Sequence, residues 1–489
     1  MKQQHLFIGI LAVIVLLLPH TSFAARSFTL GSSGYGVTLL QKQLITLGYL
    51  SSDSATGYFG PLTQAAVEKF QCTENIICSG AAYSGYGIAG PLTQQALYNF
   101  TNPEAILTGT ETRRATGKFE ISGWIPYWST ASGTQDVLPH LNQLTSVMPF
   151  NYTVTANGHL YDAGNITGTT WSSFIATAKQ AHVRVVPTVM WGNSTAEQAV
   201  LTDPASRIAL ENEIVATVRQ NNFDGIDIDF EAKTADTRNA FSAFLRELYP
   251  KMGNKWVYCT VEARMPLSDR YAPGATIPLD ATDYANDYTQ MNRYCDRVEI
   301  MAYDQGTIDK PLNKEQTGPY APVADPKWVS DLVNLAAQSI ARNKIIIGVP
   351  TYGYEYSVTP VISSSGYQYK YQMLWPFNQK YALDLMSKLG ISPIRNSAGE
   401  PSFTYVSSGN YSPTGDEVDL NPTNTVNMPS VSYTDGMSTT TGSTFNLIDW
   451  SDAQAIAQKV TLAKQLGVRG IAIFKLDGGE DPNIWNVLP

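Results

Sequence analysis

The segment FDGIDIDFE, residues 223–231, constrains the fold of this chain more than any other stretch. Side chains of a β-strand point alternately to two faces, so Ile226, Ile228 and Phe230 share one face and Asp227, Asp229 and Glu231 share the other. Carboxylates spaced roughly 6–7 Å apart repel each other, and burying them is costly unless protons or hydrogen bonds compensate. A solvated edge strand would explain the acids but not the core-like apolar face. The pattern therefore predicts a core strand whose end carries coupled catalytic carboxylates.

From Phe119 onward, short apolar runs alternate with helical stretches, which is the pattern of a parallel sheet wrapped by helices. Eight strand candidates predict an α/β fold, the (β/α)8 TIM barrel. The strand candidates are Ile121–Trp128, Leu144–Val154, Val183–Met190, Phe223–Glu231, Trp256–Glu262, Val298–Asp304, Lys344–Tyr352 and Gly470–Leu476. The helix candidates include Trp171–Ala181, Pro204–Asn221, Thr237–Leu248, Pro326–Ala341 and Asp452–Leu466.

The acidic run falls on the fourth strand, with Glu231 at the C-terminal end, where barrel enzymes place their active sites. The barrel region, 119–489, is longer than the ~250 residues typical of this fold. Much of the excess lies at about 355–446, where strand-like pieces such as Tyr367–Tyr371 and Pro401–Val406 mix with loops rich in Ser, Thr and Gly. We interpret this segment as an α+β insertion between strands seven and eight that walls one side of a cleft.

The acidic run resembles the signature of glycoside hydrolase family 18, Asp-x-x-Asp-x-Asp-x-Glu. That resemblance implies a glycosidase that acts beside N-acetylglucosamine, in which the acetamide oxygen of the sugar attacks C1. Glu231 would be the general acid, and the charge of Asp229 would raise its pKa. Asp229 would orient the acetamide, and Asp227 would share a proton with it. Asp224 and the adjacent Gly225 would serve as structural positions at the start of the strand.

Two further strand ends resemble motifs of the same family. Met301-Ala302-Tyr303-Asp304 implies that Tyr303 donates to the acetamide oxygen and that Met301 and Asp304 contact the sugar. Tyr352, in the seventh-strand motif, is a candidate wall residue. Phe474 stands where many family members place Trp beneath the sugar, so it offers a smaller flat surface. At the first strand Tyr127 and Trp128 are candidates to line the cleft, with core packing as the alternative.

Residues 28–100 form a separate small all-α module with a duplicated pattern. An amphipathic helix from Val37 to Leu47 leads to Gly-Tyr-Phe-Gly-Pro-Leu-Thr at 57–63, and Gly-Ile-Ala-Gly-Pro-Leu-Thr recurs at 87–93. The module resembles the peptidoglycan-binding domain of wall hydrolases. Residues 101–118 are polar and lack a sustained period, so they are interpreted as a linker.

The four cysteines have two kinds of setting. Cys72 and Cys78 lie close together in the small module and are predicted to form a disulfide, which export permits. Cys259 and Cys295 sit near neighbouring strands and either pair or remain buried thiols. Neither pair has zinc-site spacing, so we expect no metal and no cofactor.

The N-terminus predicts export. Residues 1–24 have the pattern of a signal peptide, with a basic start at Lys2, an apolar run from Leu6 to Leu18 and small residues before Ala25. The apolar run is shorter than the ~20 residues that a membrane span needs, so no span remains after cleavage. The chain is mildly acidic, with a formal net charge of −9, and lacks a basic stripe, which argues against nucleic acid as a partner. We expect a monomer that is secreted or associated with the cell wall.

These observations favour a secreted glycosidase that cuts β-1,4 bonds after N-acetylglucosamine in peptidoglycan. The substrate rests mainly on the N-terminal module, which is weaker support than the acidic motif gives for the reaction. Hydrolysis of chitin or chito-oligosaccharides is the enzymatic alternative. A non-catalytic glycan-binding lectin on the same barrel is the alternative from another class; the intact Glu231 argues against it, and Phe474 leaves room for it.

Overall fold

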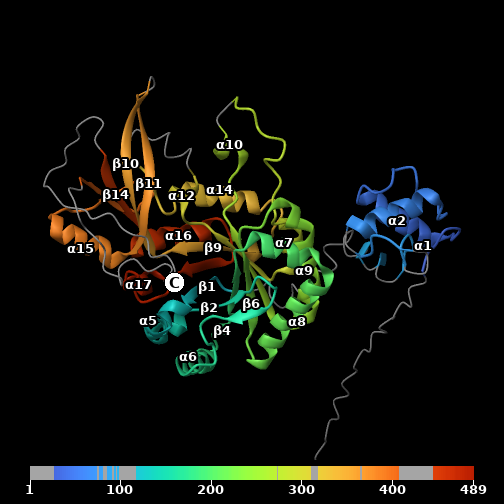
Figure 1. Cartoon of the computed structure of the whole chain (residues 1–489), viewed down its shortest axis with the longest axis horizontal. Coiled ribbons are helices and arrows are strands. Elements are labelled where there is room, and N and C mark those ends of the chain that lie inside the picture. Colours follow the sequence, from blue (N-terminus) through green and yellow to red (C-terminus); the bar gives the residue numbers. More distant parts are fainter. Residues whose placement is uncertain are drawn as a thin grey trace, which may run out of the picture. The chain divides into compact units, whose positions relative to one another are not determined.

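The computed structural model describes residues 27–73, 76–80, 85–90, 93–94, 96–97, 117–271, 274–309, 318–363, 366–406 and 444–489. The chain divides into two compact units, Met1–Ala105 and Ile106–Pro489, which are described separately (Figure 1). The expected signal peptide, 1–24, lies outside the described residues, as do most of the expected linker, 101–118, and residues 407–443 of the expected insertion. In the described part of the chain, no helix is both long and apolar enough to cross a membrane.

The N-terminal unit contains α1 (Tyr35–Thr46) and α2 (Pro61–Thr73) around a small apolar core. The sequence duplication is also a structural one. The side chain of Gln41 accepts from Gly57 N (2.8 Å) and donates to Thr63 Oγ1 (2.9 Å). Gln71 makes the same pair of bonds in the second copy, with Gly87 N (2.8 Å) and Thr93 Oγ1 (2.9 Å). Each buried glutamine therefore pins one glycine turn whose φ is positive, 75° at Gly57 and 73° at Gly87.

Eight parallel strands of the larger unit close into a ring, because β1 pairs with both β15 and β2. This confirms the predicted barrel. Around the ring the order is β1, β15, β9, β8, β7, β6, β5, β2, with β4 also paired to β2. The strands are β1 (Glu120–Pro126), β2 (Ser146–Val154), β4 (Arg184–Val185), β5 (Thr188–Trp191), β6 (Gly225–Phe230), β7 (Trp256–Glu262), β8 (Arg297–Met301), β9 (Ile345–Pro350) and β15 (Gly470–Phe474). A short antiparallel strand, β3 (Leu160–Asp162), flanks β2.

The third predicted strand, Val183–Met190, is split into β4 and β5. Pro187 lies in the gap and has no N–H to donate to a ladder, while its carbonyl still accepts from Asp227 N (2.9 Å). Helices surround the barrel in Figure 1. The longer ones are α5 (Thr130–Val137), α6 (Thr169–Gln180), α7 (Ser194–Thr202), α8 (Pro204–Gln220), α9 (Arg238–Met252), α11 (Tyr288–Tyr294), α14 (Pro326–Ala336) and α16 (Ala453–Gln465). The short ones are η2 (Tyr127–Ser129), η3 (Leu138–Gln143), η4 (Ala235–Thr237), α10 (Leu267–Arg270), α12 (Gln305–Ile308), η5 (Arg342–Lys344) and α17 (Ile484–Val487).

A second, antiparallel sheet lies between β9 and β15 in the sequence, with the order β11, β10, β14, β13, β12. Its members are β10 (Tyr352–Ser363), β11 (Gly366–Asn378), β12 (Ile394–Arg395), β13 (Pro401–Tyr405) and β14 (Phe445–Trp450), with helix α15 (Gln379–Leu389). Figure 1 shows the β10–β11 hairpin and the segment around α10 rising from the same end of the barrel. Both follow the C-terminal end of a barrel strand, so they flank the end where Glu231 lies.

Buried Glu355 is central to this second sheet. It accepts from Tyr381 Oη and Tyr405 Oη, both at 2.5 Å, and from Asn446 Nδ2. Buried Glu400 joins the sheet to the barrel, because it accepts from Val323 N (2.8 Å) and Ala324 N (2.9 Å) ahead of α14. The sheet is therefore fixed to the barrel wall by hydrogen bonds to a carboxylate.

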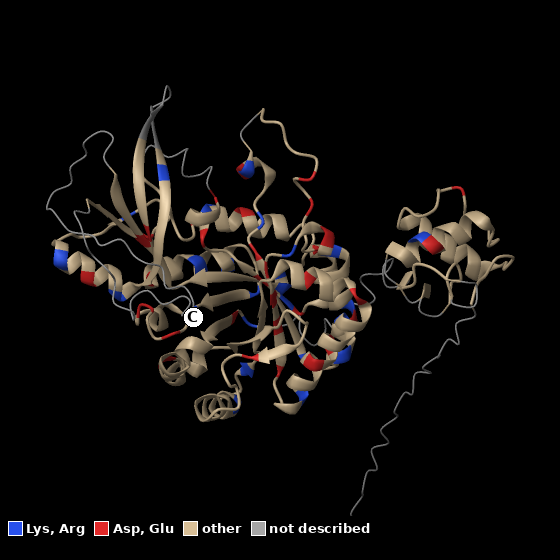
Figure 2. Cartoon of the chain, viewed as in Figure 1, with Lys and Arg blue, Asp and Glu red and all other residues tan. Residues whose placement is uncertain are grey.

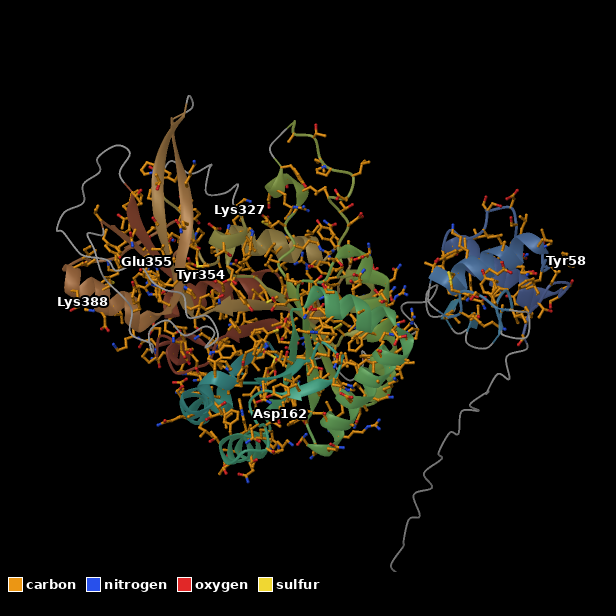
Figure 3. All side chains as sticks on the ribbon, viewed as in Figure 1. Tyr58, Asp162, Lys327, Tyr354, Glu355 and Lys388 are labelled. Atoms are coloured by element: carbon orange, nitrogen blue, oxygen red, sulfur yellow. A yellow bond between two sulfur atoms is a disulfide. The ribbon has the colours of Figure 1, made fainter. Side chains whose placement is uncertain are left out.

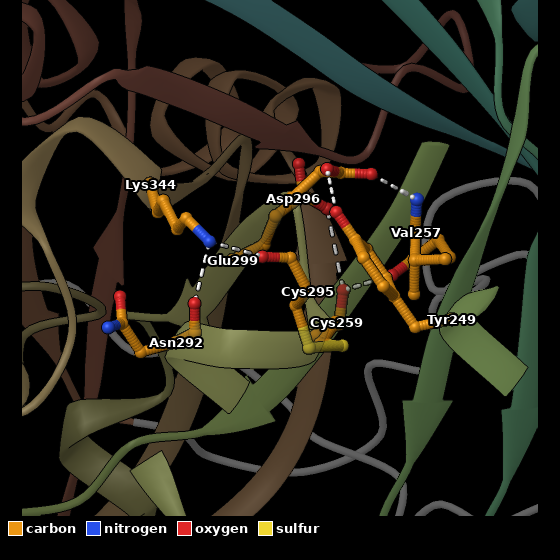
Figure 4. Close-up of a disulfide and its surroundings, with 10 residues drawn as sticks. Tyr249, Val257, Cys259, Asn292, Cys295, Asp296, Glu299 and Lys344 are labelled. Atoms are coloured by element: carbon orange, nitrogen blue, oxygen red, sulfur yellow. Dashed lines mark hydrogen bonds between the residues drawn. A yellow bond between two sulfur atoms is a disulfide. The ribbon is translucent and has the colours of Figure 1, made fainter. Parts of the chain in front are cut away.

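Both cysteine pairs form disulfides, Cys72–Cys78 and Cys259–Cys295. The second pair, which the sequence left open, ties β7 to the end of α11 (Figure 4). Next to it, Asp296 accepts from Val257 N (2.9 Å) and donates its own N–H to Val257 O (2.7 Å), so the same two elements are also joined by hydrogen bonds. Tyr249 Oη of α9 donates to the other oxygen of Asp296 (3.0 Å).

Replacing Cys259 and Cys295 together by alanine is expected to lower the free energy of unfolding by about 2–4 kcal/mol, because the cross-link restricts the unfolded chain. Hydrolytic activity at low temperature is expected to persist, since the neighbouring Asp296 bonds remain. Denaturant unfolding of the wild type with and without reductant, beside the double variant, measures the effect. Equal stability of all three would contradict it.

Candidate active site

The two faces of β6 meet different surroundings, as the alternation predicts. Ile226, Ile228 and Phe230 point to the layer between strands and helices, where the Phe230 ring lies 5.3 Å from that of Phe244 in α9. The acidic residues point into the barrel. Figure 2 shows acidic and basic residues along the central strands as well as on the outer helices. The bonds of Asp227 to side chains of other barrel strands show that this face of β6 points inward.

Asp227 is completely buried and saturated with donors. Its Oδ2 accepts from Thr188 Oγ1 (2.8 Å) and Trp124 Nε1 (3.2 Å), and its Oδ1 accepts from Thr260 Oγ1 (2.9 Å). Burial raises the pKa of Asp227, while these hydrogen bonds lower it. Donors from three other barrel strands, β1, β5 and β7, thus hold one carboxylate in a fixed orientation.

Asp229 is 3% exposed, and its Oδ1 has no hydrogen-bond partner among the described residues. Burial raises the pKa of Asp229 well above its usual range, and the charges of Glu231 and Asp227 raise it further. The group therefore holds a proton readily and has an oxygen without a protein partner. That is the state expected of a carboxyl that awaits a ligand group.

Glu231 directly follows β6 and is partly exposed at the strand end; its N–H donates to Trp191 O (2.6 Å). Burial raises the pKa of Glu231 to about 7, with the charge of Glu262 as the next cause. We predicted that the charge of Asp229 raises this pKa, and the two carboxyls do interact, since the charge of Glu231 raises the pKa of Asp229. Glu262, which lies at the end of the neighbouring strand, adds a second negative charge. Such a pKa keeps much of Glu231 protonated near neutral pH, as a general acid requires.

Tyr303 and Asp304 follow β8 and lie beside the second sheet. Tyr303 is 5% exposed, and burial raises its pKa well above its usual range. Asp304 Oδ1 accepts from Tyr352 Oη (2.5 Å) and Tyr354 Oη (2.7 Å). Tyr354 lies at the base of the β10–β11 hairpin, next to the barrel (Figure 3). Tyr352 is 1% exposed, so it supports Asp304 from behind rather than offering an open wall surface.

Phe474 ends β15 and is half-buried among aromatic rings. It stacks on Tyr303 at 5.6 Å between centroids with 15° between the planes, and its edge contacts include Trp124 at 5.9 Å. Trp128 reaches the same cluster through Phe150, 5.8 Å away. The remaining predicted binding residues, Met301 and Tyr127, are partly buried at the ends of β8 and β1. The structure thus brings the predicted aromatic residues to the strand ends beside the carboxylates.

Asp224 and Gly225 lie at the opposite end of β6. Asp224 Oδ2 accepts from Val185 N (2.8 Å) and so joins β4 to the start of β6. A Cβ on Gly225 would lie 2.5 Å from Trp256 O, so only glycine lets β6 and β7 approach here. Both residues therefore act on the fold and not on the mouth of the barrel.

Three charged residues near Glu231 escaped the sequence analysis. Glu262 ends β7 and accepts from Ala232 N (3.0 Å), immediately after Glu231. Lys233 has a buried Nζ, and Glu197 in α7 is 0% exposed; none of their polar side-chain atoms has a hydrogen-bond partner in the described part of the chain. Their sequence contexts are an ordinary strand end, loop and helix, so only the fold reveals the cluster.

Comparison with known families decides the class of this barrel. The model for glycosyl hydrolases family 18 matches residues 122–479. The chain belongs to glycosyl hydrolase family 18. A second family model, for a peptidoglycan binding domain, matches residues 33–80. The family 18 match spans every barrel strand from β2 to β15, including the acidic run, so the chain is a glycoside hydrolase with an N-terminal peptidoglycan-binding domain.

The names of similar proteins include both cortex-lytic enzymes and chitinases. The cortical fragment-lytic enzyme of Bacillus subtilis is 26% identical over 293 residues, covering 59% of this chain and 54% of that protein. The chain spans about half to two thirds of the length of the curated relatives that it matches. Two solved structures share the fold. The spore cortex-lytic enzyme SleL of Bacillus megaterium has a TM-score of 0.52 at 20% identity, over 76% of this chain and 73% of SleL. A chitinase of Chromobacterium violaceum has a TM-score of 0.54 at 18% identity, over 76% of this chain and 98% of the chitinase.

Proposed function

We propose that this family 18 enzyme cleaves β-1,4 bonds on the reducing side of N-acetylglucosamine in peptidoglycan, with retention of configuration and with assistance from the substrate acetamide. The observation that supports the reaction is the set of inward carboxylates on β6, which is followed directly by Glu231 at the barrel mouth. Glu231 donates its proton to the glycosidic oxygen as the bond to C1 breaks. Water then attacks the intermediate, and Glu231 takes a proton from that water.

Asp229 provides a hydrogen-bond acceptor and a negative charge for the acetamide group. The acetamide carbonyl oxygen attacks C1, which places positive charge on the resulting oxazolinium ring. The unpartnered Oδ1 of Asp229 accepts from the acetamide N–H, and its carboxylate offsets that charge. Asp229 shares its proton with Asp227, two residues earlier on the same face of β6, so the two carboxyls titrate as a pair.

Tyr303 and Phe474 define where the sugar sits. The Tyr303 hydroxyl, kept protonated by its raised pKa, donates to the acetamide oxygen and directs it toward C1. Phe474 provides the floor of the site, with the ring of Tyr303 stacked beside it. Asp304, held by two tyrosines, contacts the sugar, and Met301 lies on the same strand end.

The choice of peptidoglycan rests on the N-terminal domain. A peptidoglycan-binding module would hold the enzyme on the cell wall and raise the local concentration of glycan at the barrel. The cortex-lytic names of two relatives support the same substrate. We therefore place the enzyme outside the cell, at the wall, with glycan strands as its partner.

The test is a parallel digest of purified peptidoglycan and of chitin by the full chain, with reducing ends labelled by borohydride and identified by mass spectrometry. The proposal predicts new N-acetylglucosamine reducing ends from peptidoglycan. Products from chitin alone would show a chitinase. Binding to either glycan with no products from both would show a lectin on the same barrel.

A further inference from the structure

Glu262, Lys233 and Glu197 surround the acid but have no part in the proposed reaction. Glu262 comes from β7, Lys233 from the loop after β6 and Glu197 from α7, so three separate elements direct charge toward one place. Each is at least partly buried, and isolated buried charges are costly. Packing alone would be served better by apolar side chains, which points to an electrostatic task.

Glu262 is fixed in place. Its Oε1 accepts from Ala232 N (3.0 Å), and its Oε2 accepts from Asn286 Nδ2 (2.8 Å). The first bond holds the residue that directly follows Glu231, so the carboxylate cannot move away from the acid without breaking the turn. Glu262 therefore maintains a negative charge beside Glu231.

Lys233 follows Glu231 by two residues and carries the opposite charge. Its Nζ lies 4.6 Å from the centre of the Phe241 ring and has no hydrogen-bond partner in the described part of the chain. Its charge acts first on Glu262 and then on Glu197, whose two carboxylate oxygens have no hydrogen-bond partner among the described residues. Because Lys233 makes no ion pair with a described residue, its field acts on all the carboxyls around it.

Given the proposed function, we infer that Glu262 and Lys233 are opposing positioning residues that set the proton affinity of the catalytic acid Glu231. Burial alone raises that affinity; Glu262 raises it further, and Lys233 lowers it. The other titratable groups facing Glu231 are Asp229 from β6, Asp304 after β8 and Glu197 from α7. None of these is held against the Glu231 turn by a backbone hydrogen bond as Glu262 is.

Two substitutions test the inference in opposite directions. Glu262→Gln removes the negative charge and keeps an oxygen for Ala232 N–H. Because Asn286 Oδ1 is buried without a partner among the described residues, rotation of that amide lets it accept from the introduced NH2 group. Lys233→Met removes the positive charge and keeps most of the volume. We expect the pKa of Glu231 to fall by roughly 0.5–1 unit in the first variant and to rise by a similar amount in the second.

The pKa is measured without turnover, by 13C NMR titration of protein labelled at the glutamate carboxyls, with Glu231→Gln to assign the signal. The alkaline limb of the kcat/KM profile is the second readout and should move with it. Glu213→Gln, on the outer helix α8, and Lys388→Met, in α15 (Figure 3), are matched controls that should move neither. Unchanged titration of Glu231 in both variants, or shifts in the same direction, would overturn the inference. This outcome is independent of which glycan the enzyme cleaves.

Discussion

Glu231→Gln is expected to lower kcat on the natural glycan by about 10²–10⁴-fold while the Kd for that glycan changes little. The glutamine keeps the size and polarity of the side chain, but it has no proton of suitable acidity for the leaving oxygen. Initial rates and isothermal titration calorimetry on the same glycan fragment separate the two effects.

Glu213→Gln is the matched control, because Glu213 lies on the outer surface, where it pairs with His159 at 2.7 Å. It should leave both kcat and Kd at the wild-type values. If Glu231→Gln retains wild-type turnover, the acid lies elsewhere in the chain. If binding is lost together with turnover, Glu231 holds the substrate and its role as the acid is unsupported.

Asp229→Asn is expected to lower kcat by about 10²–10³-fold without lowering stability. The substitution removes the charge that offsets the oxazolinium, so turnover falls. The free energy of unfolding, in contrast, is not expected to fall. The folded-state pKa of Asp229 lies above its unfolded value, so keeping the carboxyl in the fold costs free energy once the pH exceeds the unfolded pKa of about 3.9. The neutral amide avoids that cost at pH 7.

Urea unfolding at pH 7 and steady-state kinetics measure the two halves of this prediction. The free energy of unfolding should equal or exceed that of the wild type, and the difference between the two proteins should shrink as the pH falls toward 4. A variant that is both inactive and clearly less stable would show that Asp229 is a structural carboxylate. Unimpaired turnover would exclude it from the reaction.

The sequence was sufficient to predict the barrel and the side chains of β6 that point into it, because both depend on short-range patterns. Strand alternation places Asp227, Asp229 and Glu231 together whatever surrounds them. The order of apolar runs and helices then implies eight parallel strands, and the end of the fourth is an active-site position. The split at Pro187 shows the limit of that reasoning, since an apolar run does not reveal where a ladder is interrupted.

The surroundings of the acid could not be predicted, because they depend on which strands are neighbours. Glu262 acts on Glu231 only because β7 pairs with β6 in register, Ile228 beside Cys259. Lys233 and Glu197 lie in a loop and a helix that carry no distinctive pattern. The turning of Tyr352 toward Asp304 likewise depends on the start of the second sheet. Residues that tune a site from other elements are visible only in three dimensions.

The most direct test of the central claim, proton donation by Glu231, compares two substrates of Glu231→Gln. One is a natural glycan fragment, whose leaving oxygen needs a proton. The other is an aryl β-glycoside of the same N-acetylated sugar with a dinitrophenyl leaving group, which departs without one. We expect the fold-reduction in kcat/KM caused by the substitution to be at least about tenfold smaller on the aryl glycoside than on the natural fragment. An equal loss on both substrates would contradict it.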